Sequence, residues 1–161
     1  MTLKDFGLKE GNHFVAMEYY GLILNRTFLI LLTKDSLIGL QGNGIISAEA
    51  AGRGLSTSLV NLMAVRGDLS NPYSYLKDKY IHAIENEDLL DGSILKKNKT
   101  NFIIPRKDIT GVKYDARKKW GMGNYPHDGK VYVSTAGGKK REFIILGNQS
   151  GQQIANMILA G

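Results

Sequence analysis

Residues 130–146 read KVYVSTAGGKKREFIIL, and this stretch decides the fold. Lys130–Thr135 and Arg141–Leu146 are rich in β-branched, aromatic and aliphatic residues, which favour extended strands. Between them, Ala136-Gly137-Gly138 supplies the glycine pair that is typical of a tight hairpin turn. The stretch therefore predicts two antiparallel strands joined by a short turn.

A helix is predicted soon after this hairpin. Ser150 is a suitable N-cap residue, and Met157 and Ile158 follow Ile154 by three and four residues. That spacing places the three apolar side chains on one face of a helix. We therefore expect an amphipathic C-terminal helix.

The first part of the chain predicts three further strands. Apolar runs cover His13–Leu24, Thr27–Thr33 and Ser36–Gln41, and polar breaks at Asn25-Arg26 and Lys34-Asp35 separate them. Breaks of two residues are typical of turns between neighbouring antiparallel strands. We expect a three-stranded meander whose first turn lies at Asn25-Arg26.

A helical insertion of approximately residues 47–90 is predicted next. The stretch LSTSLVNLMAVRG, residues 55–67, has the apolar spacing of a helix. Ser70-Asn71-Pro72 is typical of the start of a second helix, because proline suits the first helical turn. That second helix would carry one apolar stripe, made by Tyr73, Leu76, Tyr80, Ile81 and Ile84.

The strand pattern returns after the insertion, at residues 93–95, 101–104 and 109–115. With 161 residues the chain is long enough to bury one core, and no repeat, low-complexity tract or linker divides it. We therefore expect a single domain over residues 1–161, of the α+β class and mainly β.

Three features carry a resemblance to a known superfold. They are the step IPRKDI at residues 104–109, the strands around Gly137-Gly138, and the helix after Asn148. Together with the order of elements, they resemble the pleckstrin-homology-like (PH-like) superfold, which includes bacterial PH and GRAM-type domains. The resemblance covers roughly residues 12–41 and 93–160. It implies a barrel of two antiparallel sheets whose C-terminal helix caps one end.

Composition and motifs argue against several classes of site. The chain holds no cysteine, which excludes disulfides, thiolate nucleophiles and Cys-based metal sites. Its three histidines, His13, His82 and His127, lie in separate elements without a metal-ligand spacing. No phosphate-binding glycine loop and no Gly-x-Ser-x-Gly elbow occur. We expect a protein that is not an enzyme and that holds no cofactor or metal.

The two parts of the chain differ in charge. Residues 1–92 hold 8 Lys/Arg and 11 Asp/Glu, a net charge of −3, whereas residues 93–161 hold 13 and 4, a net charge of +9. Such an asymmetry is typical of a protein with an anionic partner, or of a solvated basic face without a specific ligand. Two clusters of cations contribute to it, Lys96, Lys97 and Lys99 and then Arg117, Lys118 and Lys119.

The second cluster opens the stretch RKKWGMGNYPHDGK, residues 117–130, which contains the single tryptophan, Trp120. Aromatic side chains beside cations suit an anionic partner that has an apolar part. Alternatively, Trp120 folds back over the barrel, and the Asp128-Gly129 step only shapes a turn. The candidate ligand-binding residues are Arg117, Lys118, Lys119, Trp120, Tyr125, His127, Lys96, Lys97 and Lys99.

On these grounds we expect a non-enzymatic PH-like module that recognises a protein or peptide partner. Anionic membrane lipid and nucleic acid, bound through the basic second half, are the alternatives. The sequence leaves the oligomeric state open, and also whether the two basic clusters form one patch. The start of the chain lacks the basic head and apolar run of a secretory signal, which predicts a cytoplasmic location.

Overall fold

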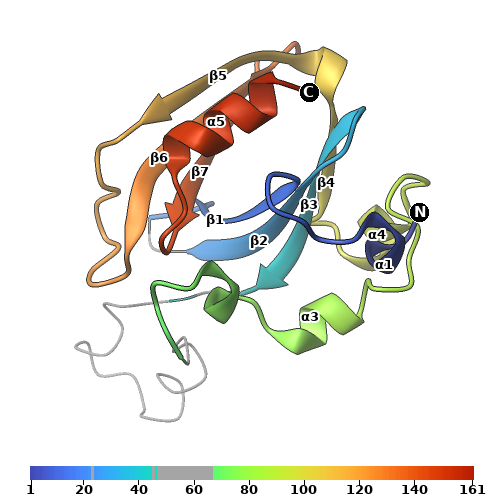
Figure 1. Ribbon diagram of the computed structural model, residues 1–161, viewed down its shortest axis with the longest axis horizontal. Helices are drawn as coiled ribbons and strands as arrows, with labels where there is room; N and C mark the ends of the chain where they lie inside the picture. Colours follow the sequence, from blue (N-terminus) through green and yellow to red (C-terminus); the bar gives the residue numbers. More distant parts are fainter. Residues whose placement is uncertain (23, 45, 47–66) are drawn as a thin grey trace.

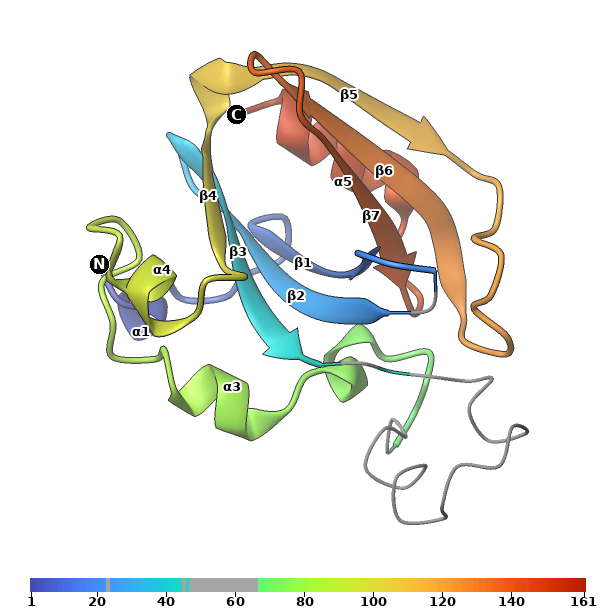
Figure 2. The ribbon, with the colours of Figure 1, turned by 180° about the vertical axis from the view of Figure 1, so that it is seen from behind.

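The computed structural model describes residues 1–22, 24–44, 46 and 67–161. Among these residues, seven antiparallel strands form one sheet in the order β4-β3-β2-β1-β7-β6-β5. Figures 1 and 2 show that the sheet curls into a half-barrel, with α5 against its concave side. The strands are β1 (His13–Tyr19), β2 (Asn25–Leu32), β3 (Ser36–Asn43), β4 (Phe102–Pro105), β5 (Ile109–Asp115), β6 (His127–Thr135) and β7 (Lys140–Leu146).

Short helices accompany the sheet. They are α1 (Leu3–Phe6), α3 (Asp78–His82), α4 (Ser93–Lys97), α5 (Gly151–Leu159) and two 3-10 helices, η2 (Pro72–Tyr75) and η3 (Arg106–Asp108). The hydroxyl of Ser150 accepts the N–H of Gln153 (3.3 Å) at the start of α5. The predicted C-terminal helix and its cap are therefore confirmed, as is the mainly β, α+β class.

The sheet itself is continuous, which corrects the expected pair of sheets. Strand β1 pairs with β7 at Ala16↔Ile145 and Met17↔Ile144, so the meander β1–β3 and the hairpin β6–β7 belong to one sheet. A side chain extends this join. The amide of Gln149 accepts the N–H of Val15 (2.9 Å) and donates to the carbonyl of Val15 (2.7 Å). Gln149 thus takes the place of a neighbouring strand where the backbone pairing stops.

Strands β1–β3 are buried on both faces. Successive side chains of a strand point to opposite faces, so each strand contributes to two separate clusters. The concave cluster contains Phe14 and Phe28 and is closed by Ile154 of α5. The convex cluster contains Val15 and Leu29 and is covered by α1 and by the segment from residue 69 to residue 94. Burial on both faces explains why these strands are almost continuously apolar in sequence.

The first turn does not lie at Asn25-Arg26. Strand β1 ends at Tyr19 and β2 begins at Asn25, and between them the N–H of Tyr20 donates to the carbonyl of Leu24 (3.0 Å). Asn25 is instead the buried first residue of β2, and its side chain bonds the N–H (2.8 Å) and the carbonyl (2.6 Å) of Ile46. The polar residue that suggested a turn therefore satisfies buried backbone groups.

Two expected elements in and after the insertion are also corrected. Residues 93–95 begin α4 rather than a strand, and the side chain of Asn101 donates to the carbonyl of Ile94 (2.9 Å) there. The expected second helix is divided into η2 and α3, because the N–H of Lys77 donates to the carbonyl of Gly42 on β3 (2.8 Å). The helix expected over residues 55–67 lies, except for Gly67, outside the described residues.

Candidate functional site

The loop between β5 and β6 exposes the single tryptophan. The side chain of Trp120 is 82% exposed, so the alternative in which it folds back over the barrel is wrong. Two residues further, Met122 is buried in the convex cluster, and the hydroxyl of Tyr19 contacts its sulfur (3.5 Å). The loop is therefore anchored by Met122 next to the end of β1, and it presents Trp120 to solvent.

The other two aromatic candidates support this loop from within. Tyr125 is partly buried in the convex cluster, with its ring centroid 5.8 Å from that of Tyr75. His127 is buried; its Nδ1 donates to the carbonyl of Tyr125 (3.0 Å), and its Nε2 accepts the N–H of Lys119 (2.9 Å). These partners require a neutral ring. Both side chains position the loop and are turned away from the outer surface.

The cations of the loop have partners inside the domain. Arg117 forms an ion pair with Asp115 (2.8 Å), and Lys119 pairs with Glu142 (2.5 Å). The ammonium group of Lys118 donates to the carbonyl of His127. The guanidinium of Arg117 holds the pKa of Asp115 well below its usual range. The side chain of Arg117 is 84% exposed and that of Asp115 only 10%, so the charge facing solvent is positive.

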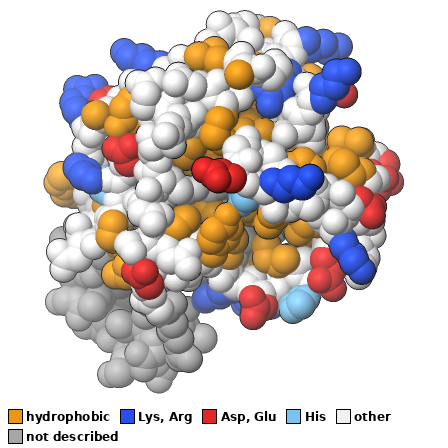
Figure 3. Space-filling view, viewed as in Figure 1, with side chains coloured by type: hydrophobic (Ala, Val, Ile, Leu, Met, Phe, Trp, Pro, Cys, Tyr) orange, Lys and Arg blue, Asp and Glu red, His pale blue; other side chains and the backbone are white. Residues whose placement is uncertain are grey.

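The other basic cluster lies elsewhere. Lys96 and Lys97 belong to α4 and Lys99 follows it, and Lys97 pairs with Glu87 (3.0 Å). Figures 1 and 2 show α4 and the β5–β6 loop at opposite sides of the molecule. In Figure 3 the Lys and Arg side chains of the visible face are scattered among acidic ones. The two clusters therefore do not join into one basic patch.

The turn between β1 and β2 adds apolar side chains beside the loop. Leu22 is 95% exposed, and Tyr20 and Leu24 are also exposed. The guanidinium of Arg26 stacks on the ring of Tyr20, 3.9 Å from its centroid. Sequence reasoning missed these residues because the apolar run up to Leu24 looked like a continuing strand. We call this surface the aromatic end, formed by Tyr20, Leu22, Leu24, Arg26, Arg117, Lys118 and Trp120.

Two concave regions lie away from the aromatic end. One, of about 510 Å³, lies between β4 and the turn that joins β6 to β7. The other, of about 570 Å³, lies between the start of β1, η2 and the start of α5, where Nε2 of His13 hydrogen bonds to the hydroxyl of Tyr73. No group of three or more His, Cys, Asp or Glu side chains that would suit a metal ion occurs among the described residues.

No protein-family model matches this chain, and comparisons with curated proteins and with solved structures find no match either. The resemblance to PH-like domains therefore remains a prediction from the sequence. Across the described part of the chain, no helix has both the length and the apolar character needed to span a bilayer.

The free energy of unfolding is expected to fall as the pH is lowered below about 6.5. Burial lowers the pKa of both His13 and His127, and Lys118 and Lys130 act in the same direction on His127. The unfolded chain takes up these protons at about pH 6.5, before the folded state does. The stabilisation is therefore complete above about pH 6.5 and is lost below it.

Urea denaturation at a series of pH values measures this dependence. Each histidine contributes a slope of at most about 1.4 kcal/mol per pH unit. The variant His127→Gln is expected to remove its share of the slope. His82→Gln is the matched control, since the side chain of His82 is 69% exposed on α3. A slope that persists unchanged in His127→Gln would contradict the assignment.

Proposed function

We propose that this chain is a non-enzymatic binding module that attaches to an anionic membrane surface through its aromatic end. One observation carries the proposal: Trp120 and Leu22, 82% and 95% exposed, lie on two loops at the same end of the sheet. Moving apolar side chains as large and as exposed as these out of water lowers the free energy of the system. Tryptophan in particular favours the boundary between lipid head groups and acyl chains.

The charge around these side chains supports an anionic lipid surface. Arg117 and Lys118 are exposed beside Trp120, whereas the carboxylate of Asp115 is nearly covered. Each Lys or Arg close to an anionic bilayer contributes about 1 kcal/mol of attraction. Stable peripheral attachment usually needs two signals, and an apolar tip with a basic surround supplies both. The anionic leaflet of the plasma membrane faces the cytoplasm, which agrees with the expected location.

We also make a proposal about the fold of this binding module. We propose a PH-like domain, supported by the curled antiparallel sheet, by the order of its strands, and by α5 closing the concave cluster. For the protein or peptide partner expected from the sequence, we propose a different surface. Nucleic-acid binding, the remaining alternative, has less support because the two basic clusters lie apart.

Vesicle sedimentation tests the membrane proposal. We expect the protein to sediment with phosphatidylcholine vesicles that contain phosphatidylserine, not with phosphatidylcholine alone, and to be released at high salt. The emission of Trp120 should shift to shorter wavelength on binding, since it is the single tryptophan of the chain. Trp120→Ala and Leu22→Ser should each weaken binding by about tenfold or more, because each removes an inserting side chain.

A pair of charge reversals supplies the control. Lys118→Glu, at the aromatic end, is expected to weaken sedimentation clearly, whereas Lys96→Glu, on α4 at the other side, should leave it nearly unchanged. Equal losses in the two variants would contradict the assigned surface. No sedimentation with the anionic vesicles would overturn the proposal, and a salt-sensitive quench of Trp120 by single-stranded oligonucleotide would then favour nucleic acid.

A further inference from the structure

Strand β4 has a free edge. It pairs with β3 on one side only, and it ends the described sheet. One residue beyond β4, the N–H of Arg106 donates to the carbonyl of Asp35 (2.9 Å). This bond shows which residues of β4 direct their backbone groups toward β3. Backbone groups of successive residues in an antiparallel strand point to opposite sides. Phe102 and Ile104 therefore bond toward β3, and the backbone of Ile103 points away from it.

The outer side of β4 offers the backbone groups for one more strand. Ile103 presents an N–H and a carbonyl there, and Pro105 presents a carbonyl but has no N–H. Within the described ranges, none of these groups bonds to a loop, turn or side chain. An added antiparallel strand would form two hydrogen bonds with Ile103 and would donate one more to Pro105. Because Pro105 donates nothing, the added strand has a preferred position along this edge.

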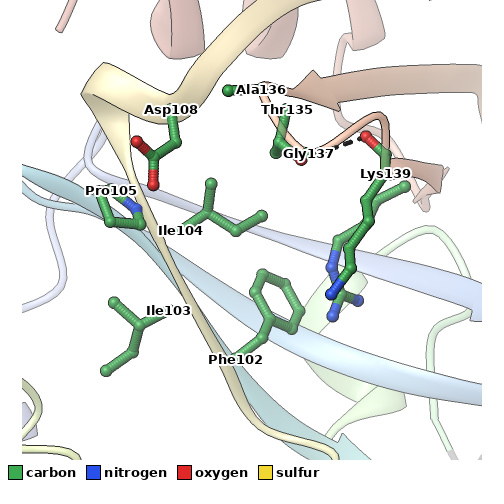
Figure 4. A pocket seen from close by; sticks show the side chains of 10 residues that line it. Phe102, Ile103, Ile104, Pro105, Asp108, Thr135, Ala136, Gly137 and Lys139 are labelled. Carbon is green, nitrogen blue, oxygen red and sulfur yellow. Dashed lines mark hydrogen bonds between the residues drawn. The ribbon is translucent and has the colours of Figure 1, made fainter.

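A groove of about 510 Å³ lies beside this edge (Figure 4). Phe102 and Ile104 line one side of it, and the turn between β6 and β7 lines the other. Lys139 lies across the groove from Phe102, and Asp108 lies near its far end, beside Ile104. The guanidinium of Arg141 stacks on the ring of Phe102, 3.6 Å from its centroid. The groove thus combines an apolar wall with charged groups at defined places.

We propose that the free edge of β4 and this groove accept an extended segment of a partner protein as an added strand, with an acidic side chain directed at Lys139. In such strand addition, backbone hydrogen bonds supply affinity, and alternate side chains supply specificity. The site lies on the seam of the half-barrel and uses none of the residues of the aromatic end. The proposal is therefore independent of membrane attachment.

The alternation of side chains sets what the groove prefers. The residue of the added strand opposite Ile103 faces the convex side, and its two neighbours enter the groove beside Phe102 and Ile104. The neighbour beside Ile104 meets an apolar wall, which favours an aliphatic side chain.

The neighbour beside Phe102 meets two cations, Arg141 and Lys139, which differ in whether an acidic side chain pairs with them. The charge of Arg141 is balanced by Glu18 (2.8 Å). Lys139 is exposed and forms no ion pair with any residue in the described ranges, so its charge is unbalanced. An acidic side chain at this position of the added strand is therefore favoured. Asp108 at the other end of the groove disfavours a second acid there.

Selection from a library of random dodecapeptides displayed on phage tests this proposal. We expect enriched peptides that alternate aliphatic with other residues and share an acid two positions from an aliphatic residue. Synthetic copies of them should shift the backbone amide resonance of Ile103, the outward donor, in nitrogen-15 NMR spectra. The variant Lys139→Glu should bind these peptides about tenfold more weakly, because repulsion replaces attraction. Lys140→Glu, an exposed neighbour outside the groove, is the matched control and should bind normally.

A second variant tests the backbone contribution. Ile103→Pro removes the outward N–H without removing a hydrogen bond to β3, so it should abolish peptide binding. Far-UV circular dichroism checks that this variant folds. If it does not fold, the binding of the peptides to Lys139→Glu and the shift of the Ile103 amide resonance still test the proposal. The proposal is overturned if no peptide is enriched above an empty surface. It is equally overturned if the enriched peptides bind Lys139→Glu as tightly as the unchanged protein.

Discussion

Replacing Gly129 by alanine is expected to destabilise the domain by about 2–5 kcal/mol. Gly129 lies in β6 with φ of 61°, and a Cβ there would lie 2.2 Å from the carbonyl oxygen of Asp115 and 2.9 Å from Cα of Ala116. The left-handed conformation alone costs about 1–2 kcal/mol for alanine. Moving the backbone of β5 away from the new methyl group adds about 1–3 kcal/mol.

The control for this prediction is Gly138→Ala. Gly138 has φ of 73°, and a Cβ there would meet nothing within 4 Å. This variant should therefore lose only the conformational part, about 1–2 kcal/mol. Urea denaturation followed by far-UV circular dichroism measures both, since an exposed Trp120 reports poorly on unfolding. Equal losses in the two variants would contradict a steric role for Asp115 and Ala116.

The position of Gly129 connects stability with the proposed function. The residue that its substitution would displace, Asp115, holds both Arg117 (2.8 Å) and Lys130 (3.4 Å). Arg117 stands at the base of the loop that carries Trp120. We therefore infer that the register shift of β6 at Gly129 helps to position the aromatic end, in addition to allowing β6 to pair with β7.

The elements that the sequence predicted well are those set by local signals. The hairpin at Gly137-Gly138, the strand Ile109–Asp115 and the capped helix after Ser150 each depend on residues a few positions apart. The continuity of the sheet depends instead on the contacts that β1 makes with Ile145 and with the side chain of Gln149, two residues that are far from β1 in sequence. Turn and strand propensities carry no information about such a distant pairing.

The candidate site was predictable only in part, for a similar reason. The stretch from Arg117 to Lys130 was predicted as notable from its composition, and it does expose Trp120. Its charges could be counted, but their partners could not, because Glu142, which pairs with Lys119, lies on β7 beyond this stretch. Leu22 was missed because an exposed leucine and a buried one look the same in sequence.

A second large loss of stability is expected from substitutions in the apolar wall of the groove beside β4. A Cβ on Gly39 would lie 2.0 Å from Cε1 of Phe102, whose ring covers that glycine. The ring has little room to move, since Phe28 packs edge-on to it (centroids 5.3 Å apart) and Phe143 stacks on it (6.0 Å). Gly39→Ala is therefore expected to destabilise the domain by about 3 kcal/mol, the upper end for overpacking. Phe102→Ala is expected to lose about 3–5 kcal/mol, as for other buried phenylalanines.

The double variant separates the steric explanation from a general intolerance of substitution in β3. If the ring of Phe102 is what excludes a methyl group at Gly39, then Gly39→Ala should be almost neutral once Phe102 is alanine. The coupling between the two positions should then be about 3 kcal/mol, far above the few tenths seen for independent sites. Denaturation of the two single variants and the double variant measures it, with Phe102→Leu as a milder background should Phe102→Ala prove too unstable to study.

Gly111 supplies the matched control for this cycle. It is also a strand glycine, in β5, but a Cβ there would meet nothing within 4 Å. Gly111→Ala should be neutral or slightly stabilising, because alanine loses less backbone entropy on folding than glycine. Additive losses at Gly39 and Phe102 would show that the ring does not exclude the methyl group. A large coupling would establish that the apolar wall of the groove is a fixed surface, which strand addition beside β4 requires.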